Sequence, residues 1–230
     1  MTFTAVARCP RTGMLGVGMA TRAPAVGNRC PVVRPGYGAA SVQLIADPRQ
    51  TMLCGRLLDL GYSAGKVLAE LQASDRHIIR RQIGIVDSYG NTAAFSGPTS
   101  NSFSGHVEGR QWVAMGNAVV SEAVVKAIAG SLESSENEEL WERLARAVEA
   151  GGRAGGQLEG QNSAALLVYG AEPFALVDLR VDWHPEPIGE LRRIYDWFRP
   201  LIPYYQERVH DPYIIREDRW RDAKLAEVHG

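Results

Sequence analysis

The first two residues of the chain, Met1 and Thr2, hold the group best suited to covalent chemistry. Removal of Met1 would leave Thr2 as the first residue of an apolar run. A terminal threonine carries a nucleophilic hydroxyl and a free α-amine, whose ordinary pKa of about 7.7–8.0 suits a general base near neutral pH. Threonine paired with its own terminal amine is a known form of activated nucleophile. Thr2 is therefore a candidate nucleophile, with an ordinary Met-Thr chain start as the alternative.

Other patterns of reactive residues are missing from the sequence. The five histidines are scattered, without the spacing of a metal site. Cys9, Cys30 and Cys54 have no Cys-x-x-Cys spacing, and we expect them to be reduced, buried thiols. The glycines of 151–156 follow a predicted helix instead of opening one, which favours a turn over a phosphate loop. We therefore expect no metal and no cofactor.

The composition limits the classes of partner. The chain has 230 residues, of which 45% are hydrophobic and 22% charged, as in a soluble globular protein. Its formal net charge of −1, with no basic stripe, argues against nucleic acid or an anionic membrane as a partner. No segment approaches the ~20 apolar residues of a membrane helix, and the first residues do not resemble a signal peptide. We expect a cytoplasmic protein.

Hydrophobic spacing places strands in pairs and helices in blocks. Ser63 is a predicted N-cap, Gly151-Gly152 is predicted to end a helix, and Pro187 is predicted to begin one. Because a doubly wound parallel sheet would alternate strand and helix, this order favours antiparallel sheets with helices on their outer faces, an α+β fold. Strands are predicted at 3–8, 14–20, 38–44, in two parts of 82–95 around Gly90-Asn91, and at 112–117, 163–169 and 175–181; helices are predicted at 49–60, 63–73, 121–132, 138–150 and 187–198.

Four segments carry a resemblance to a known family. TFTAVARCPRTGMLGVGMATRAPAVG, RRQIGIVD, QNSAALLVYG and especially VDLRVDWHPEPIGELRRI are similar to the prokaryotic family called domain of unknown function 1028. The resemblance runs from Thr2 to about Tyr195. That family is classed with the N-terminal-nucleophile (Ntn) hydrolases. The resemblance therefore implies a four-layer α-β-β-α sandwich and supports Thr2 as the nucleophile.

The proteasome-like Ntn pattern suggests helpers for Thr2. The segment ending at Asn117 resembles the Gly-Ser-Gly segment beside the nucleophile. The segment 159–165 resembles the Asp-x-x-Ser-Gly-Gly segment that holds the terminal amine, so Glu159 with Asn162 or Ser163 would supply those groups. The sequence differs from the pattern in having Arg34 as the only cation near the place of the helper lysine, and Thr21 in place of an aspartate.

Further polar residues stand where this sequence matches the family. Arg22 is predicted to bind a substrate carboxylate, with a structural ion pair as the alternative. Asn117 is predicted to donate to an oxyanion, with an Asx turn as the alternative. His184 is either an acid–base group or a capping residue. The predicted site thus has Thr2, Asn117 and Glu159 as catalytic residues and binds substrate through Arg22, Gln43, Ser163 and His184.

Two hypotheses of function follow. In the first, residues 1–198 form a hydrolase of a C–N amide-like bond in a small molecule, with Thr2 as nucleophile. In the second, the same fold binds a ligand or a partner without using Thr2, or works through other side chains such as His184 with Glu159. Residues 199–230 are too aromatic for a disordered tail, so we expect them to pack on the body or on a second copy of the chain, in a homo-oligomer.

Overall fold

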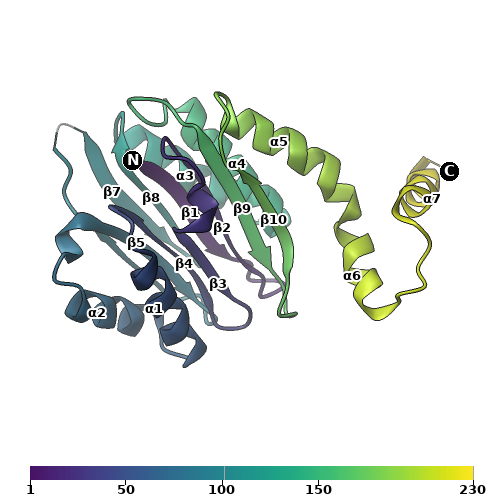
Figure 1. The fold of residues 1–230 in the computed structure, drawn as a ribbon, viewed down its shortest axis with the longest axis horizontal. Coiled ribbons are helices and arrows are strands. Elements are labelled where there is room, and N and C mark those ends of the chain that lie inside the picture. Colours follow the sequence, from purple (N-terminus) through teal and green to yellow (C-terminus); the bar gives the residue numbers. More distant parts are fainter. Residues whose placement is uncertain (101, 230) are drawn as a thin grey trace. The chain divides into compact units, whose positions relative to one another are not determined.

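Two antiparallel sheets form the centre of residues 1–191 (Figure 1). The computed structural model describes residues 1–100 and 102–229. One sheet has six strands in the order β10-β9-β2-β1-β8-β7, and the other has four in the order β3-β4-β5-β6. The strands are β1 (Thr2–Arg8), β2 (Leu15–Thr21), β3 (Pro31–Arg34), β4 (Gly38–Leu44), β5 (Arg81–Asp87), β6 (Thr92–Ser96), β7 (Phe103–Gly109), β8 (Trp112–Val119), β9 (Ser163–Tyr169) and β10 (Ala175–Val181).

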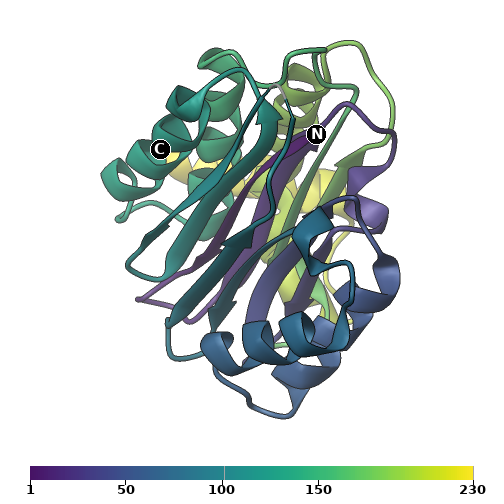
Figure 2. The same ribbon diagram turned by 90° about the vertical axis from the view of Figure 1, so that its left-hand side faces the viewer.

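Helices cover the outer face of each sheet (Figure 2). α1 (Pro48–Asp59) and α2 (Ala64–Ser74) pack on the four-stranded sheet, while α3 (Glu122–Ser134) and α4 (Leu140–Arg153) pack on the six-stranded sheet. Short 3-10 helices lie at Val26–Asn28 (η1) and Ile78–Arg80 (η2). The predicted four-layer α-β-β-α sandwich is confirmed.

The side chains of β1 alternate between the two faces of their sheet. Thr2, Thr4 and Val6 share the face toward the other sheet, as the hydrogen bond from Thr4 to Gln43 of β4 shows. Phe3 lies on the opposite face, against α4. A Cβ at Gly151 would come within 2.9 Å of the Phe3 ring, so this close approach needs a glycine inside the helix. The prediction that Gly151-Gly152 ends the helix is wrong, because α4 continues to Arg153.

The space between the sheets changes from apolar to polar along the strands. Val6 is paired in register with Val17 and Val113, in the apolar core. Two residues earlier, Thr4 is paired with Met19 and Met115. At the start of β1, the residues of this face are hydroxyl- and amide-bearing. The candidate nucleophile Thr2 therefore lies at the polar end of the sandwich.

The chain divides into two compact units, Met1–Leu191 and a second that begins at Arg192. The division lies within α5 (Pro187–Phe198), a few residues before the boundary predicted at 198. The second unit also contains η3 (Arg199–Leu201), α6 (Ile202–His210) and α7 (Glu217–His229). Its aromatic rings contact one another: Tyr204 lies 5.2 Å from Tyr205 and 5.6 Å from Trp220, between ring centroids.

Candidate functional site

Four side chains form a polar row across the six-stranded sheet. The register pairs Thr2 of β1 with Asn117 of β8 on one side and with Thr21 of β2 on the other, and Thr21 is paired in turn with Ser163 of β9. Cross-strand partners point to the same face of a sheet, here toward the second sheet. None of the four is more than 4% exposed. The fold thus brings together three of the predicted site residues: Thr2, Asn117 and Ser163.

The hydroxyl of Thr2 lies beside a second hydroxyl. The Oγ1 atoms of Thr2 and Thr21 are 3.1 Å apart. Both hydroxyls donate to the carbonyl oxygen of Met1, that of Thr2 over 2.6 Å. Met1 therefore covers the candidate nucleophile while it is present. Thr21, where the related pattern has an aspartate, takes part through its hydroxyl instead of a charge.

A buried network of amide side chains from the four-stranded sheet contacts the polar row. Gln82 of β5 is its centre, because its Oε1 accepts from Gln43 Nε2 and Asn117 Nδ2, both over 2.8 Å. Its Nε2 donates to Ser96 and to the carbonyls of Gly105 and Gly116. Gln43 Oε1 accepts from Thr4 over 2.7 Å. The predicted substrate-binding residue Gln43 thus lies fully buried within this network.

The network fixes the orientation of the Asn117 amide. Since the Gln82 oxygen can only accept, the group of Asn117 that contacts it must be the NH₂. The Oδ1 atom of Asn117 is then left buried and without a hydrogen-bond partner among the described residues. A buried acceptor of this kind is costly unless something donates to it. The side chain predicted to donate to an oxyanion therefore offers an acceptor beside Thr2.

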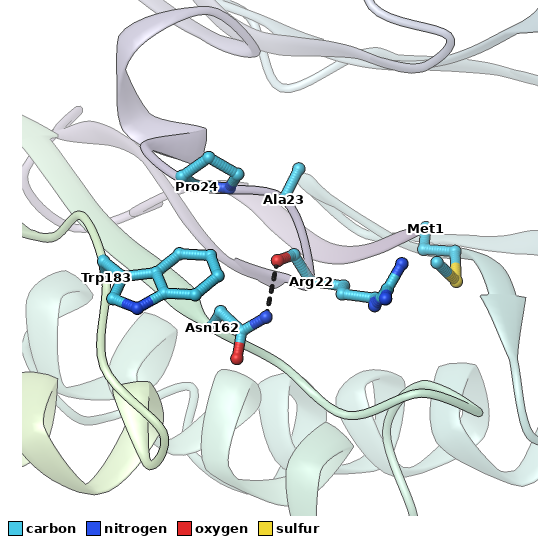
Figure 3. A pocket seen from close by; sticks show the side chains of 6 residues that line it. All are labelled: Met1, Arg22, Ala23, Pro24, Asn162 and Trp183. Carbon is cyan, nitrogen blue, oxygen red and sulfur yellow. Dashed lines mark hydrogen bonds between the residues drawn. The ribbon is translucent and has the colours of Figure 1, made fainter.

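Ser163 and Asn162 hold the segment that follows β2. Ser163 Oγ donates to the carbonyl of Ala23 over 2.7 Å and accepts from the Val26 N–H over 3.2 Å. Asn162 donates through its backbone to Thr21 and through its side chain to the carbonyl of Arg22 (Figure 3). The start of β9 thereby fixes the loop beside Thr2.

Two pockets open at this end of the sandwich. The first, the Arg22 pocket, has a volume of about 330 Å³; the second, the Thr2 pocket, has about 270 Å³. Met1 and Ala23 line both, so the two pockets meet there. The Arg22 pocket is lined by Met1, Arg22, Ala23, Pro24, Asn162 and Trp183 (Figure 3), and the Thr2 pocket by Met1, Thr2, Thr21, Ala23, Val26, Arg29, Cys30, Leu44, Ile45 and Ala46.

The remaining predicted residues lie outside the polar row. Glu159 contacts Arg22, with 2.8 Å between the carboxylate and the guanidinium, and both side chains are about half exposed. His184 is half-buried, and its Nδ1 accepts from the Glu186 N–H over 3.0 Å. Arg34, the position compared with the helper lysine, pairs with Asp59 of α1. The candidate site thus has two parts. One is a buried centre of hydroxyl and amide side chains, and the other is the half-exposed ion pair of Arg22 and Glu159.

Burial changes the acidity of groups at the Thr2 pocket. Desolvation lowers the pKa of the Met1 α-amine, because burial disfavours the ammonium form. Burial also raises the pKa of the Cys30 thiol to about 11, so this thiol is protonated and a poor nucleophile at neutral pH. All three cysteines are free and buried, as predicted. The pocket therefore favours an uncharged amine.

In the described part of the chain, no three His, Cys, Asp or Glu side chains gather as a metal site would require. Among the helices described, none has the length and apolar character needed to cross a membrane.

Comparison with known proteins assigns a family. The sequence matches the family of unknown function DUF1028 over residues 2–191. The chain belongs to the DUF1028 family. The predicted resemblance is thereby confirmed, and the family match ends where the first unit ends.

Solved structures similar to this chain include another DUF1028 protein. A DUF1028 protein from Silicibacter pomeroyi has a TM-score of 0.78 and 28% identity, covering 86% of this chain and 85% of its own. Anbu (ancestral β-subunit) from Yersinia bercovieri has a TM-score of 0.44 and 12% identity, with 89% and 96% covered. An Anbu mutant from a Hyphomicrobium strain gives 0.41 and 11%, with 90% and 100% covered. None of the curated proteins compared with the chain matches it.

Two residues of the site, Gln82 and Trp183, are not among the functional residues predicted from the sequence. Gln82 stands in a strand predicted only from its apolar neighbours, and Trp183 occurs in a segment whose sequence assigns it no role. Thr21 was noted only as a departure from the related pattern. A sequence signal existed in the polar alternation of Thr2 and Thr4 at the start of an apolar strand, but its partners depend on a register between strands far apart in the chain.

Proposed function

We propose that this DUF1028 protein hydrolyses a C–N amide-like bond in a small molecule, with Thr2 as the nucleophile once Met1 is removed. The observation that carries the proposal is the position of the Thr2 hydroxyl. It stands at the start of β1, in the wall of a pocket and 3.1 Å from the Thr21 hydroxyl. In a chain that begins at Thr2, the α-amine lies on the same residue as the hydroxyl, within reach for proton transfer.

The reaction proceeds in two stages. Thr2 Oγ1 attacks the carbonyl carbon of the amide, and the hydroxyl proton passes to the α-amine. The C–N bond breaks as the departing amine takes that proton, which leaves an ester on Thr2. Water then adds to the ester carbonyl and gives one proton to the α-amine. Cleavage of the C–O bond releases the acid, and that proton returns to Thr2 Oγ1 to restore the hydroxyl.

The neighbours of Thr2 suit this sequence of steps. The unpartnered Asn117 Oδ1 is an acceptor for an N–H of the α-amine and would orient the lone pair of the amine toward the hydroxyl. Thr21 can accept a hydrogen bond from the Thr2 hydroxyl, or donate one to it, over the 3.1 Å contact. Desolvation lowers the pKa of the Met1 amine, and the same effect would favour the free base of an amine at Thr2 in the wall of this pocket.

Backbone N–H groups are the candidates for binding the oxyanion. Leu44, in the wall of the Thr2 pocket, has a φ of 79°, an unusual backbone conformation for a leucine. The next N–H, that of Ile45, donates to the Arg80 carbonyl over 3.2 Å. The N–H of Ala46, also in the pocket wall, is therefore the donor we assign to the oxyanion.

The test begins with a ligand search on protein whose first residue has been verified as Thr2 by intact mass. A metabolite present at 100 times its Kd stabilises the fold by about 2.7 kcal/mol, which a thermal-shift assay detects. Amides found in this way are then assayed for hydrolysis. We expect Thr2→Ala to lower kcat by about 10³-fold or more and Thr2→Ser to keep measurable activity. The exposed Thr12→Ala is the control, with unchanged activity. Full activity in Thr2→Ala would contradict the proposal.

A second candidate function is ligand binding without catalysis. The contact that favours it is the Met1 carbonyl, which accepts from both threonine hydroxyls and so occupies them. On this alternative, Met1 is retained in the working protein and the Arg22 pocket binds a ligand beside it. Protein that retains Met1 and binds the same metabolites, with equal affinity, as protein beginning at Thr2 would support the alternative.

A further inference from the structure

Met1 lies where the two pockets meet, so its removal would join them into one cleft. Met1 lines both pockets and separates them, together with Ala23. The register explains its position: since Thr2 faces Thr21 across the antiparallel pair, the next pair along is Met1 and Arg22. Removal of Met1 therefore vacates a position directly beside Arg22 and in front of Thr2. A substrate that reaches the Thr2 hydroxyl passes Arg22 on one side and the Thr2 pocket on the other.

Arg22 has unused hydrogen-bonding capacity. Its Nη1 contacts one oxygen of Glu159 over 2.8 Å. Its other guanidinium N–H groups have no partner in the part of the chain that the structure describes. A guanidinium has five N–H donors in a planar fork that matches a carboxylate. Figure 3 shows the Arg22 side chain extended toward Met1, with Asn162 between it and Trp183. Glu159 thus positions Arg22 and leaves donors for an anionic ligand.

Trp183 adds an apolar wall at the other end of the same pocket. Its side chain is 66% exposed, which is unusual for the largest apolar residue. The indole lines the Arg22 pocket across from the guanidinium (Figure 3). An aromatic face across the pocket from a guanidinium suits the short carbon chain that carries a carboxylate.

The Thr2 pocket has a different character. Its wall beyond the two threonines is formed mainly by apolar residues, Val26, Cys30, Leu44, Ile45 and Ala46. The one cation in that lining is Arg29, whose guanidinium donates to the Pro24 carbonyl. This end of the cleft therefore suits an uncharged apolar group.

We propose that the cleft takes an amide with a carboxylate on one side of its C–N bond, bound by Arg22, and an apolar group on the other side, bound in the Thr2 pocket. This inference rests on the proposed function, because it places the scissile bond at Thr2. It names the substrate class that the two ends of the cleft select together.

The test measures binding without turnover, in protein that begins at residue 2 and carries Thr2→Ala. Two probes place the groups in opposite directions across the amide: benzoylglycine and N-benzylsuccinamic acid. Each is compared by calorimetry with its own primary carboxamide, which removes the negative charge and keeps the shape. We expect at least one acid to bind about tenfold more tightly than its carboxamide, since a charge-assisted pair is lost in the latter.

Variants then locate the carboxylate. Arg22→Gln should reduce the preference for the acid to less than about twofold. Arg11→Gln is the matched control, because Arg11 is also half exposed and paired with a glutamate, Glu139, at the far end of the β1–β2 hairpin. It should keep the full preference. Glu159→Gln should strengthen acid binding, since it removes the carboxylate that competes for Arg22. The melting temperature of each variant checks that it is folded.

Equal binding of acids and carboxamides would overturn the inference, as would binding of neither. An acid preference that survives Arg22→Gln would also overturn it and would point to Arg29 instead. These outcomes are separate from a failure of the proposed function. Acid preference without hydrolysis by the Thr2 form would contradict catalysis alone, whereas hydrolysis of amides without acid preference would contradict only the substrate class.

Discussion

The proposed reactive centre consists of uncharged groups more than of ions. Thr2 contacts the Thr21 hydroxyl, and Asn117 is held by Gln82 with its oxygen unpartnered among the residues described. A lysine and an aspartate in these places would tune the nucleophile by charge, whereas here burial is the main influence on the pKa of the Met1 amine. Thr2 itself could be proposed from the sequence, because a terminal threonine is recognisable by type. The role of Gln82 could not, since it follows from contacts with four other strands.

Gln82→Leu tests how much the buried amide network contributes to the free energy of unfolding. The change leaves the amide hydrogens of Gln43 and Asn117 and the two backbone carbonyls near β7 and β8 without their partner. Because a buried polar group without a partner costs about 1–3 kcal/mol, we expect the free energy of unfolding to fall by about 3 kcal/mol or more. Urea unfolding measures the loss.

The control for this substitution is Gln72→Leu on the exposed face of α2, which should change the free energy of unfolding by less than about 0.5 kcal/mol. A Gln82→Leu protein as stable as this control would show that the network contributes nothing.

Most elements were predictable, and the exceptions have physical reasons. Strands with apolar runs were found within about two residues, as with β9 at Ser163–Tyr169 and β10 at Ala175–Val181. β7 (Phe103–Gly109) was missed because it is an edge strand whose residues are all at least partly exposed, so its sequence lacks an apolar pattern. Gly151 does not end α4 as predicted, because this glycine lies inside the helix where it allows the close contact with Phe3.

Two glycine substitutions test the packing of helices on the six-stranded sheet. A Cβ at Gly16 of β2 would lie 2.7 Å from the Leu144 side chain and 2.8 Å from the Leu167 carbonyl, so Gly16→Ala should cost about 1–3 kcal/mol. Gly130 of α3 is exposed, with nothing within 4 Å of its Cβ position. Gly130→Ala should therefore stabilise the protein by about 0.5–1 kcal/mol. Chemical unfolding of both gives the result, and effects of equal sign would refute this account of the packing.

The chain consists of a unit with the DUF1028 fold and a shorter second unit. The DUF1028 match covers residues 2–191, and the second unit begins at Arg192. The site lies entirely in the first unit. The resemblance in the sequence predicted this fold from four short segments, whereas the helices α6 and α7 were predicted only as an aromatic extension. The sequence of α7 is mostly charged, and α6 is short with two adjacent tyrosines, so neither shows a clear apolar helical period.

We propose that the second unit supports a homo-oligomer. Tyr213 is 92% exposed and Ile215 52% exposed, and such apolar side chains on a surface favour contact with a partner. In sedimentation experiments, the full chain should have at least twice its 25.1 kDa mass. Tyr213→Ser with Ile215→Ser should shift the mass toward one chain.

Tyr89→Ser, at a tyrosine of the first unit that is 84% exposed, is the control and should leave the oligomer intact. A single-chain mass for the unaltered protein would contradict the proposal of a homo-oligomer.

The most direct test of Thr2 as nucleophile is acyl transfer from 4-nitrophenyl acetate to protein that begins at Thr2. We predict a burst of one nitrophenol per chain and a gain of one acetyl group. Mass spectrometry of a digest should locate the acetyl group on the peptide that begins at Thr2. Hydroxylamine should remove that group, because it cleaves an ester on the hydroxyl but leaves an amide on the α-amine. Thr2→Ala should show no burst, and Thr12→Ala a full one. A burst that persists in Thr2→Ala, or an acetyl group located elsewhere, would contradict the role of Thr2.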